Sequence, residues 1–208
     1  MLLWADTGLF FPCQVRYLYE GREHLLVLFK IRATPLDTIR SVMIIRGPEQ
    51  SDQSAIEQLF AALLTAGNQH VLPPYLLTQQ NPVNITNALY TSAQSNKDLH
   101  RFGFTRGQAV VYGFLSSWED SLQSPQLSLA VHPSFRRHGF ARTMCNQLHD
   151  LARIRGARSV RVLILRENKD AIALCQSLGY RLSPATETHL HGSRDLDEIQ
   201  NEHSRQVA

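Results

Sequence analysis

The residues with the clearest chemistry form a basic loop that contains one glycine, VHPSFRRHGFARTM, over residues 131–144. Pro133 ends the apolar strand before the loop, because proline cannot donate a hydrogen bond to a strand ladder. Gly139 stands where a helix is expected to begin, and the first N–H groups of a helix form a natural anion site. Arg136, Arg137 and Arg142 add positive charge. This pattern favours a site for a small anionic group such as a pyrophosphate.

Other anion-binding motifs do not fit this loop. It lacks the GxxxxGK[ST] spacing of a P-loop, and two of the three glycines of a dinucleotide-binding fingerprint are missing. A nucleic-acid interface is the other interpretation of a basic cluster. Aromatic residues do not interleave with the arginines as single-strand stacking would require, and a net charge of +3 is small. We therefore expect no nucleic-acid partner.

Two motifs together resemble a known family. The stretch LSLAVHPSFRRHGFARTM resembles the acyl-CoA-binding motif V-x-P-x-x-[QR]-x-x-G-x-[GA] of the GNAT N-acetyltransferases. Downstream, NKDAIALCQSLGYR resembles the family's N-x-x-A-x-x-L-Y-x-x-x-G-[FY]. The resemblance is specific over residues 127–181, looser over residues 41–126, and does not extend to residues 1–40.

The resemblance implies an acetyl-CoA-dependent N-acetyltransferase in which a primary amine attacks the thioester directly. The acceptor would be a small-molecule amine or a protein amine. Backbone groups of the strand would pair with the pantetheine arm, the loop amides would hold the pyrophosphate, and one side chain after the next strand would contact the cofactor. The implied cofactor-binding residues are Leu129, Ala130, Val131, Arg136, Arg137, His138, Gly139, Phe140, Ala141, Arg142 and Asn168. No metal is implied.

The residues that handle protons depart from the family pattern. The family's usual acid is a tyrosine seven residues after the asparagine, and here that position is Cys175. A thiol can donate a proton, so Cys175 is the catalytic candidate, but packing against the core is the simpler interpretation. The central strands carry no carboxylate that would serve as a base. A non-catalytic acyl-CoA-binding sensor or structural domain is therefore the alternative.

Several residues outside the two motifs are further candidates. Glu119 and Asp120 precede the strand of the first motif and are the nearest carboxylates to a base position, and a solvated turn is the simpler interpretation. His70 and Tyr75 lie in an irregular region that is rich in Asn, Gln, Thr and Pro; they are candidates for the acceptor pocket, and a surface loop is the alternative. Cys145 shares the inner face of the expected helix and is predicted to be core.

The elements that position these residues predict an α/β fold with a mixed, mostly antiparallel sheet flanked by helices, which is the GNAT fold. We expect a β-hairpin extension in residues 1–40. The acetyltransferase domain is expected in residues 41–194, and a polar tail in residues 195–208. We expect a helix from an N-cap at Ser51 to Gly67, only partial helix in residues 68–97, and helices after Gly139 and Asn168. The strand SVRVLIL is expected to be internal.

The length and the cysteine content indicate the class of protein and its compartment. The chain has 208 residues and three cysteines at positions 13, 145 and 175, with no CxxC pair. Widely spaced, odd-numbered cysteines argue against a disulfide framework and favour a reducing compartment. No apolar run approaches the roughly 20 residues that span a bilayer. We expect a cytoplasmic protein that does not bind membranes, and the sequence leaves a homodimer open.

Overall fold

The computed structural model describes residues 13–19, 22–30, 40–67, 72–79, 81–94, 98–118 and 123–197. The strands in this part of the chain are β1 (Cys13–Tyr19), β2 (Arg22–Lys30), β3 (Arg40–Arg46), β4 (Leu99–Thr105), β5 (Gln108–Ser116), β6 (Gln126–Val131), β7 (Ser159–Leu165), β8 (Arg181–Pro184) and β9 (His189–Asp195). The helices are α1 (Gln53–Thr65), α2 (Pro74–Leu77), α3 (Pro82–Gln94), α4 (Phe140–Ile154) and α5 (Lys169–Ser177).

The strands form one sheet in the order β1-β2-β3-β4-β5-β6-β7-β9-β8. Every neighbouring pair is antiparallel except β6 and β7, which are parallel. This confirms the predicted mixed, mostly antiparallel sheet, and β7 is internal as expected. The predicted hairpin is β1 with β2, and β2 pairs with β3. The hairpin therefore extends the sheet at its β3 edge.

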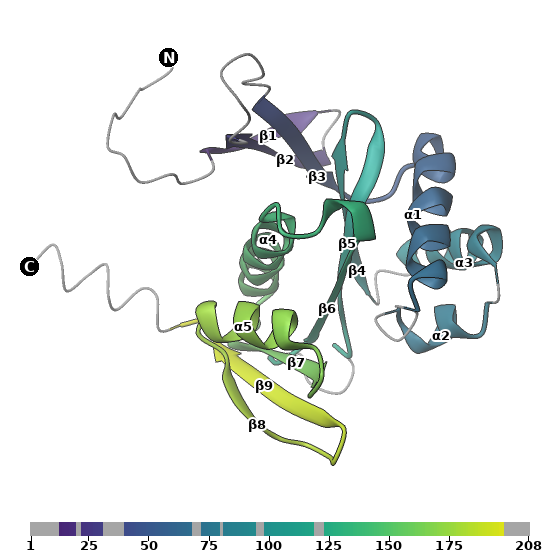
Figure 1. The fold of residues 1–208 in the computed structure, drawn as a ribbon. Helices are drawn as coiled ribbons and strands as arrows, with labels where there is room; N and C mark the ends of the chain where they lie inside the picture. The colour runs from purple at the N-terminus through teal and green to yellow at the C-terminus, as the bar shows by residue number, and fades with distance from the viewer. Residues whose placement is uncertain are drawn as a thin grey trace, which may run out of the picture.

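Helices cover both faces of the sheet (Figure 1). Helices α1, α2 and α3 lie on one face, and α4 and α5 lie on the other. Each face has its own buried cluster. The cluster under α1 to α3 combines aliphatic side chains with a group of aromatic rings that includes Phe60, Phe102 and Tyr112, whose side chains are all fully buried. The cluster under α4 and α5 is largely aliphatic.

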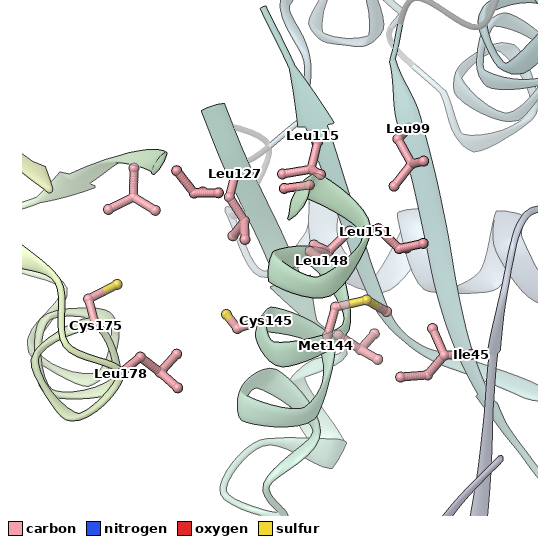
Figure 2. Packing of buried hydrophobic residues seen from close by; sticks show 14 of the residues in the cluster. Ile45, Leu99, Leu115, Leu127, Met144, Cys145, Leu148, Leu151, Cys175 and Leu178 are labelled. Carbon is pink, nitrogen blue, oxygen red and sulfur yellow. The ribbon is translucent and has the colours of Figure 1, made fainter. Parts of the chain in front are cut away.

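Helix α4 confirms its predicted inner face. Phe140, Met144, Leu148 and Leu151 recur at helical spacing and are all buried. Figure 2 shows Met144, Leu148 and Leu151 directed at the strands, while Cys145 points from the flank of the same helix toward α5. The helix approaches β5 closely at Gly113, where an added Cβ would lie 2.8 Å from Cγ of Met144. A glycine is needed there because no side chain fits.

The expected start of the first helix was wrong. Ser51 lies inside a 3-10 turn, Gln50–Asp52, and α1 begins at Gln53 with Asp52 as its N-cap. The reason is the carboxylate of Asp52, which accepts hydrogen bonds from both terminal nitrogens of Arg46, at 2.5 and 2.7 Å, and from the backbone N–H of Glu49. These bonds stabilise the 3-10 turn that leads into α1, so Ser51 lies within the turn and does not cap the helix.

The irregular region contains more helix than predicted. Helix α3 spans 13 residues, Pro82–Gln94. The side chain of Asn81 accepts from the backbone N–H of Asn84, and proline occupies the first helical position, where its missing N–H costs nothing. Ile85 and Leu89 are fully buried. These cap residues were visible in the sequence, but the polar run around them concealed the helix.

Some predictions lie outside the described residues. His70, Glu119 and Asp120 fall there, as do residues 198–208 of the predicted tail. The domain boundaries at residues 40 and 194 stay a prediction; strand β3 begins at Arg40 and β9 ends at Asp195.

Candidate functional site

The parallel strands β6 and β7 form a fork. Their ladder has a single pair, Gln126 with Arg161. The closed end is held by side chain and backbone together: the backbone N–H of Arg161 donates to the carbonyl of Pro125 at 2.9 Å, and its Nε donates to the carbonyl of Ser124 at 2.8 Å. Beyond this point the strands separate. The backbone of β6 that faces β7 therefore has no ladder partner from residue 127 onward.

A cavity of about 770 Å³ fills the open part of the fork. Its walls come from both strands, from the loop before α4 and from helices α4 and α5. All but one of the predicted cofactor residues line it, together with the catalytic candidate: Leu129, Ala130, Val131, Arg136, Arg137, Gly139, Phe140, Ala141, Arg142, Asn168 and Cys175. The structure thus brings together two motifs that are separated by a helix and a strand.

The basic loop meets the cavity at the N-terminus of α4. Gly139 is the N-cap, with a left-handed φ of 83°, and no side chain caps the first turn. Arg137 is also left-handed, with a φ of 66°. These two reversals wrap the chain around the helix end, where the first amide groups have no intrahelical partner. The result is a turn of N–H donors that opens on the cavity.

The arginines of the loop reach the neighbouring helix α5. Arg137 pairs with Asp170 at 2.5 Å, and Nη2 of Arg142 donates to Ser177 at 2.6 Å. Both side chains of the Arg137–Asp170 pair are largely exposed, at 80% and 71%, so this ion pair adds little stability. These contacts do connect the two walls of the cavity.

His138 is the predicted cofactor residue that does not line the cavity. Its Nδ1 lies 2.7 Å from the carbonyl oxygen of Arg136, and its ring stacks on Phe140 at 6.0 Å between centroids. Within the structure His138 therefore supports the shape of the loop.

Asn168 and Cys175 sit at the two ends of α5. The side chain of Asn168 accepts from the backbone N–H of Ala171 at 3.1 Å, so it is the N-cap that the sequence predicted. Cys175 is 8% exposed, and burial raises the pKa of its thiol to about 11. Burial likewise raises the pKa of Cys145. Figure 2 shows both side chains in the region between α4 and α5, with Leu178 beside Cys175. Both thiols are protonated at neutral pH.

A second set of buried polar groups was not apparent in the sequence. Oη of Tyr180 lies 2.6 Å from Nε2 of His149, whose Nδ1 lies 2.8 Å from Nη1 of Arg194. Burial and the charges of Arg194 and Arg153 lower the pKa of His149 to about 3. His149 lies on α4, Tyr180 lies directly before β8, and Arg194 lies on β9. Tyr180 occupies the [FY] position of the second motif, but no signal in the sequence joins it to His149 or Arg194.

A comparable network lies on the other face of the sheet. His100 contacts the hydroxyl groups of Tyr75, at 3.0 Å from Nε2, and of Tyr112, at 2.9 Å from Nδ1. Burial lowers the pKa of His100 to about 4 and raises that of Tyr75 to about 12. Tyr75, an acceptor-pocket candidate, does not line the cavity of the fork. The network fastens α2 to strands β4 and β5.

The residues that the structure describes contain no cluster of three or more His, Cys, Asp or Glu side chains arranged to hold a metal ion. No helix among them combines the length and the apolar character needed to cross a membrane.

Comparisons with known proteins agree with this geometry. The model of the acetyltransferase (GNAT) family matches residues 81–180. The thialysine N-ε-acetyltransferase of Caenorhabditis elegans is 31% identical over 116 residues, which are 53% of this chain and 71% of that protein.

Solved structures share the fold. An N-acetyltransferase from Staphylococcus aureus Mu50 has a TM-score of 0.59 at 18% identity, covering 74% of this chain and 99% of that one. A putative acetyltransferase from Salmonella typhimurium, solved with its cofactor acetyl-CoA, has a TM-score of 0.58 at 23% identity, covering 75% and 95%. The matched region contains the fork, the loop and α5, and the chain belongs to the acetyltransferase (GNAT) family.

Proposed function

We propose that the chain transfers an acetyl group from acetyl-CoA to a primary amine, by direct attack of the amine on the thioester. Acetyl-CoA is the acyl donor of this family. The observation that carries the proposal is the fork between β6 and β7, because its cavity runs from unpaired strand backbone to the N–H groups at the start of α4.

The residues of the fork fit such a donor. A cavity of about 770 Å³ is in the usual range for ligand sites. Leu163 of β7 lines it with 52% of its surface exposed, which is unusual for a large apolar side chain on an internal strand. A ligand with an apolar arm would cover this surface. At the other end, the α4 amides and Arg136 suit a pyrophosphate.

We propose that the arm of the donor binds along β6 in the way that an additional β-strand would pair with it. The backbone groups of Leu129, Ala130 and Val131 that face β7 are beyond the last ladder pair and can hydrogen-bond to an extended amide chain. A backbone N–H aimed at the thioester oxygen stabilises the negative charge that develops when the amine attacks.

The amine must lose a proton to react. An alkylammonium has a pKa near 10.4, so deprotonation at neutral pH costs about 4–5 kcal/mol. Glu119 and Asp120 stay the nearest candidates for a general base. Cys175 stays the residue at the usual acid position, and replacing it by Ala and by Tyr tests that role. An unchanged kcat in both variants would exclude it.

The acceptor is proposed to be a small alkyl amine. The relative that shares 31% identity is named for the ε-amine of thialysine, and that name favours an amine at the end of a flexible chain. Protein amines are the second acceptor class.

The test is release of free CoA from acetyl-CoA, followed with a thiol reagent against a panel of amines. The panel contains thialysine, lysine and peptides with a free α-amine. We expect turnover with the small amines, and product mass increased by one acetyl group. Binding of acetyl-CoA without turnover on any acceptor would contradict the enzyme and favour the non-catalytic sensor.

A further inference from the structure

Tyr180 lines the buried wall of the fork together with Cys145 and Cys175. Its side chain is only 5% exposed. Its backbone N–H donates to the carbonyl of Cys175 at 3.0 Å. The ring also packs against β9, where a Cβ added to Gly192 would lie 3.5 Å from Cδ1 of Tyr180. The phenol therefore has a fixed position in the wall of the cavity.

The hydrogen bonds behind Tyr180 have a defined direction. A guanidinium only donates, so Arg194 must donate to Nδ1 of His149. A neutral imidazole then carries its proton on Nε2, and this N–H donates to Oη of Tyr180 at 2.6 Å. The oxygen of Tyr180 thus accepts on the side of His149. The hydrogen of the Tyr180 hydroxyl group is therefore not used in the bond to His149.

The protonation states agree with this direction. The pKa of His149 is about 3 because the ring is buried and faces the positive charges of Arg194 and Arg153. Burial, with Cys145 and Cys175 nearby, raises the pKa of Tyr180. His149 therefore stays neutral, and Tyr180 keeps its proton, throughout the pH range in which an acetyl transfer is measured. A chain of donors runs from Arg194 through His149 to Tyr180.

We propose that Tyr180 donates a hydrogen bond to the sulfur of the acyl donor as the carbon–sulfur bond breaks, and that His149 and Arg194 are the positioning residues that orient this hydroxyl group. This inference rests on the proposed function. The amine nitrogen forms the new bond to the carbonyl carbon, and the sulfur leaves with the electron pair. The proton that the amine loses becomes available to the sulfur, so the products are the amide and the free thiol.

The phenol acts as a donor that keeps its proton. A thiol has an unperturbed pKa of about 8.5, well below that of a phenol, so full proton transfer from Tyr180 to the thiolate would be uphill. Each donor behind a hydroxyl group polarises it and strengthens the bond that it makes. Cys175 lines the same wall, but a thiol is a weak donor. Tyr180 is therefore the better group for the departing charge.

The test is the pKa of the CoA thiol in the complex of protein and product. It is measured from thiolate absorbance between about pH 6 and pH 10, with the complex of desulfo-CoA subtracted to remove the protein's own thiols and phenols. We expect the bound thiol of the wild type to titrate below free CoA. Tyr180→Phe should raise this pKa by about 1–2 units, because a hydrogen bond to a charged group is lost.

Positioning by His149 is tested by rescue. His149→Leu removes the donor to Tyr180 and should shift the thiol pKa in the same direction as Tyr180→Phe. His149→Gln keeps an N–H group and should restore part of the shift. A purely structural role for His149 would change the free energy of unfolding but leave the thiol pKa of the folded complex unchanged.

Tyr90→Phe is the matched control, since Tyr90 loses a hydroxyl that donates to the carbonyl of Glu49, away from the fork. Its thiol pKa should equal that of the wild type. If CoA does not bind the wild type, the proposed function fails along with the inference. Two results would overturn the inference alone. In the first, CoA binds but its thiol pKa is not below that of free CoA. In the second, Cys175→Ala raises the thiol pKa and Tyr180→Phe does not.

Discussion

The two glycines that bound helix α4 allow the anion site to be tested against an internal control. Gly139 precedes the helix with a φ of 83°, and Gly156 follows it with a φ of 87°. Both are in the left-handed region, where a Cβ costs about 1–2 kcal/mol. Only Gly139 lies in the wall of the cavity. Substituting each in turn therefore separates backbone strain from loss of the anion site.

The expected magnitudes differ between stability and binding. Gly139→Ala and Gly156→Ala should both lower the free energy of unfolding by about 1–2 kcal/mol, or roughly 2–8 °C in Tm for a domain of this size. Gly139→Glu adds a negative charge beside the proposed pyrophosphate. At about 4 Å and an effective dielectric constant of about 20, each unit charge on the phosphate is repelled by about 4 kcal/mol, a loss of roughly a thousandfold in affinity.

The assay is isothermal titration with acetyl-CoA, with thermal unfolding of the same samples. We expect Gly139→Glu to abolish measurable binding, and Gly156→Glu, which is equally strained and equally charged, to retain the wild-type Kd. Since the added Cβ at Gly156 meets no atom within 4 Å, that variant should fold. Wild-type affinity in Gly139→Glu would refute the assignment of the loop as the pyrophosphate site.

Three further predictions concern the scaffold. Asp52→Asn breaks the two-point ion pair with Arg46, which is 17% exposed, and should cost about 2–3 kcal/mol in urea unfolding; an unchanged midpoint would mean that the pair is not formed. Gly113→Ala places a Cβ 2.9 Å from Cδ1 of Leu148 and should destabilise by about 1–3 kcal/mol, with a lowered Tm as the readout. The pKa of His100 is lowered to about 4 in the folded state. The stabilisation that neutral His100 gives the folded state is therefore complete above the unfolded pKa of about 6.5 and is lost as pH falls toward 4. His100 should therefore account for up to about 3 kcal/mol of the unfolding free energy lost over that window, and His100→Gln should make the profile less steep while His149 still contributes; an equally steep profile in the variant would show that other groups cause the whole loss.

Local signals explain why much of the fold could be predicted. The helix after Gly139 has its apolar residues at helical spacing and a glycine at each end, and both the buried face and the two left-handed glycines are observed. Asn168 was expected to cap α5, and it does. These features depend on residues within one or two turns of each other, so the sequence contains the whole interaction.

Errors occurred where a side chain from the preceding strand or a weak apolar pattern decided the outcome. The start of α1 moved from Ser51 because Arg46 of the preceding strand binds Asp52. Helix α3 was underestimated because its apolar face has few members among polar neighbours, although Ile85 and Leu89 are fully buried by packing against α1 and the sheet. For α3, tertiary contacts outweighed the weak local pattern.

The sequence by itself determined the local chemistry of this protein: an anion loop at a helix start, a capped second helix, and the spacing that places it in the acetyltransferase (GNAT) family. Only the tertiary structure decided that β6 and β7 separate after one ladder pair, which opens the cavity between them. It also joined His149 to Tyr180, 31 residues away along the chain, and to Arg194, 45 residues away. The physical reason is that a loop and its helix are built from neighbouring residues, whereas a directed chain of donors requires partners that only folding brings within hydrogen-bonding distance.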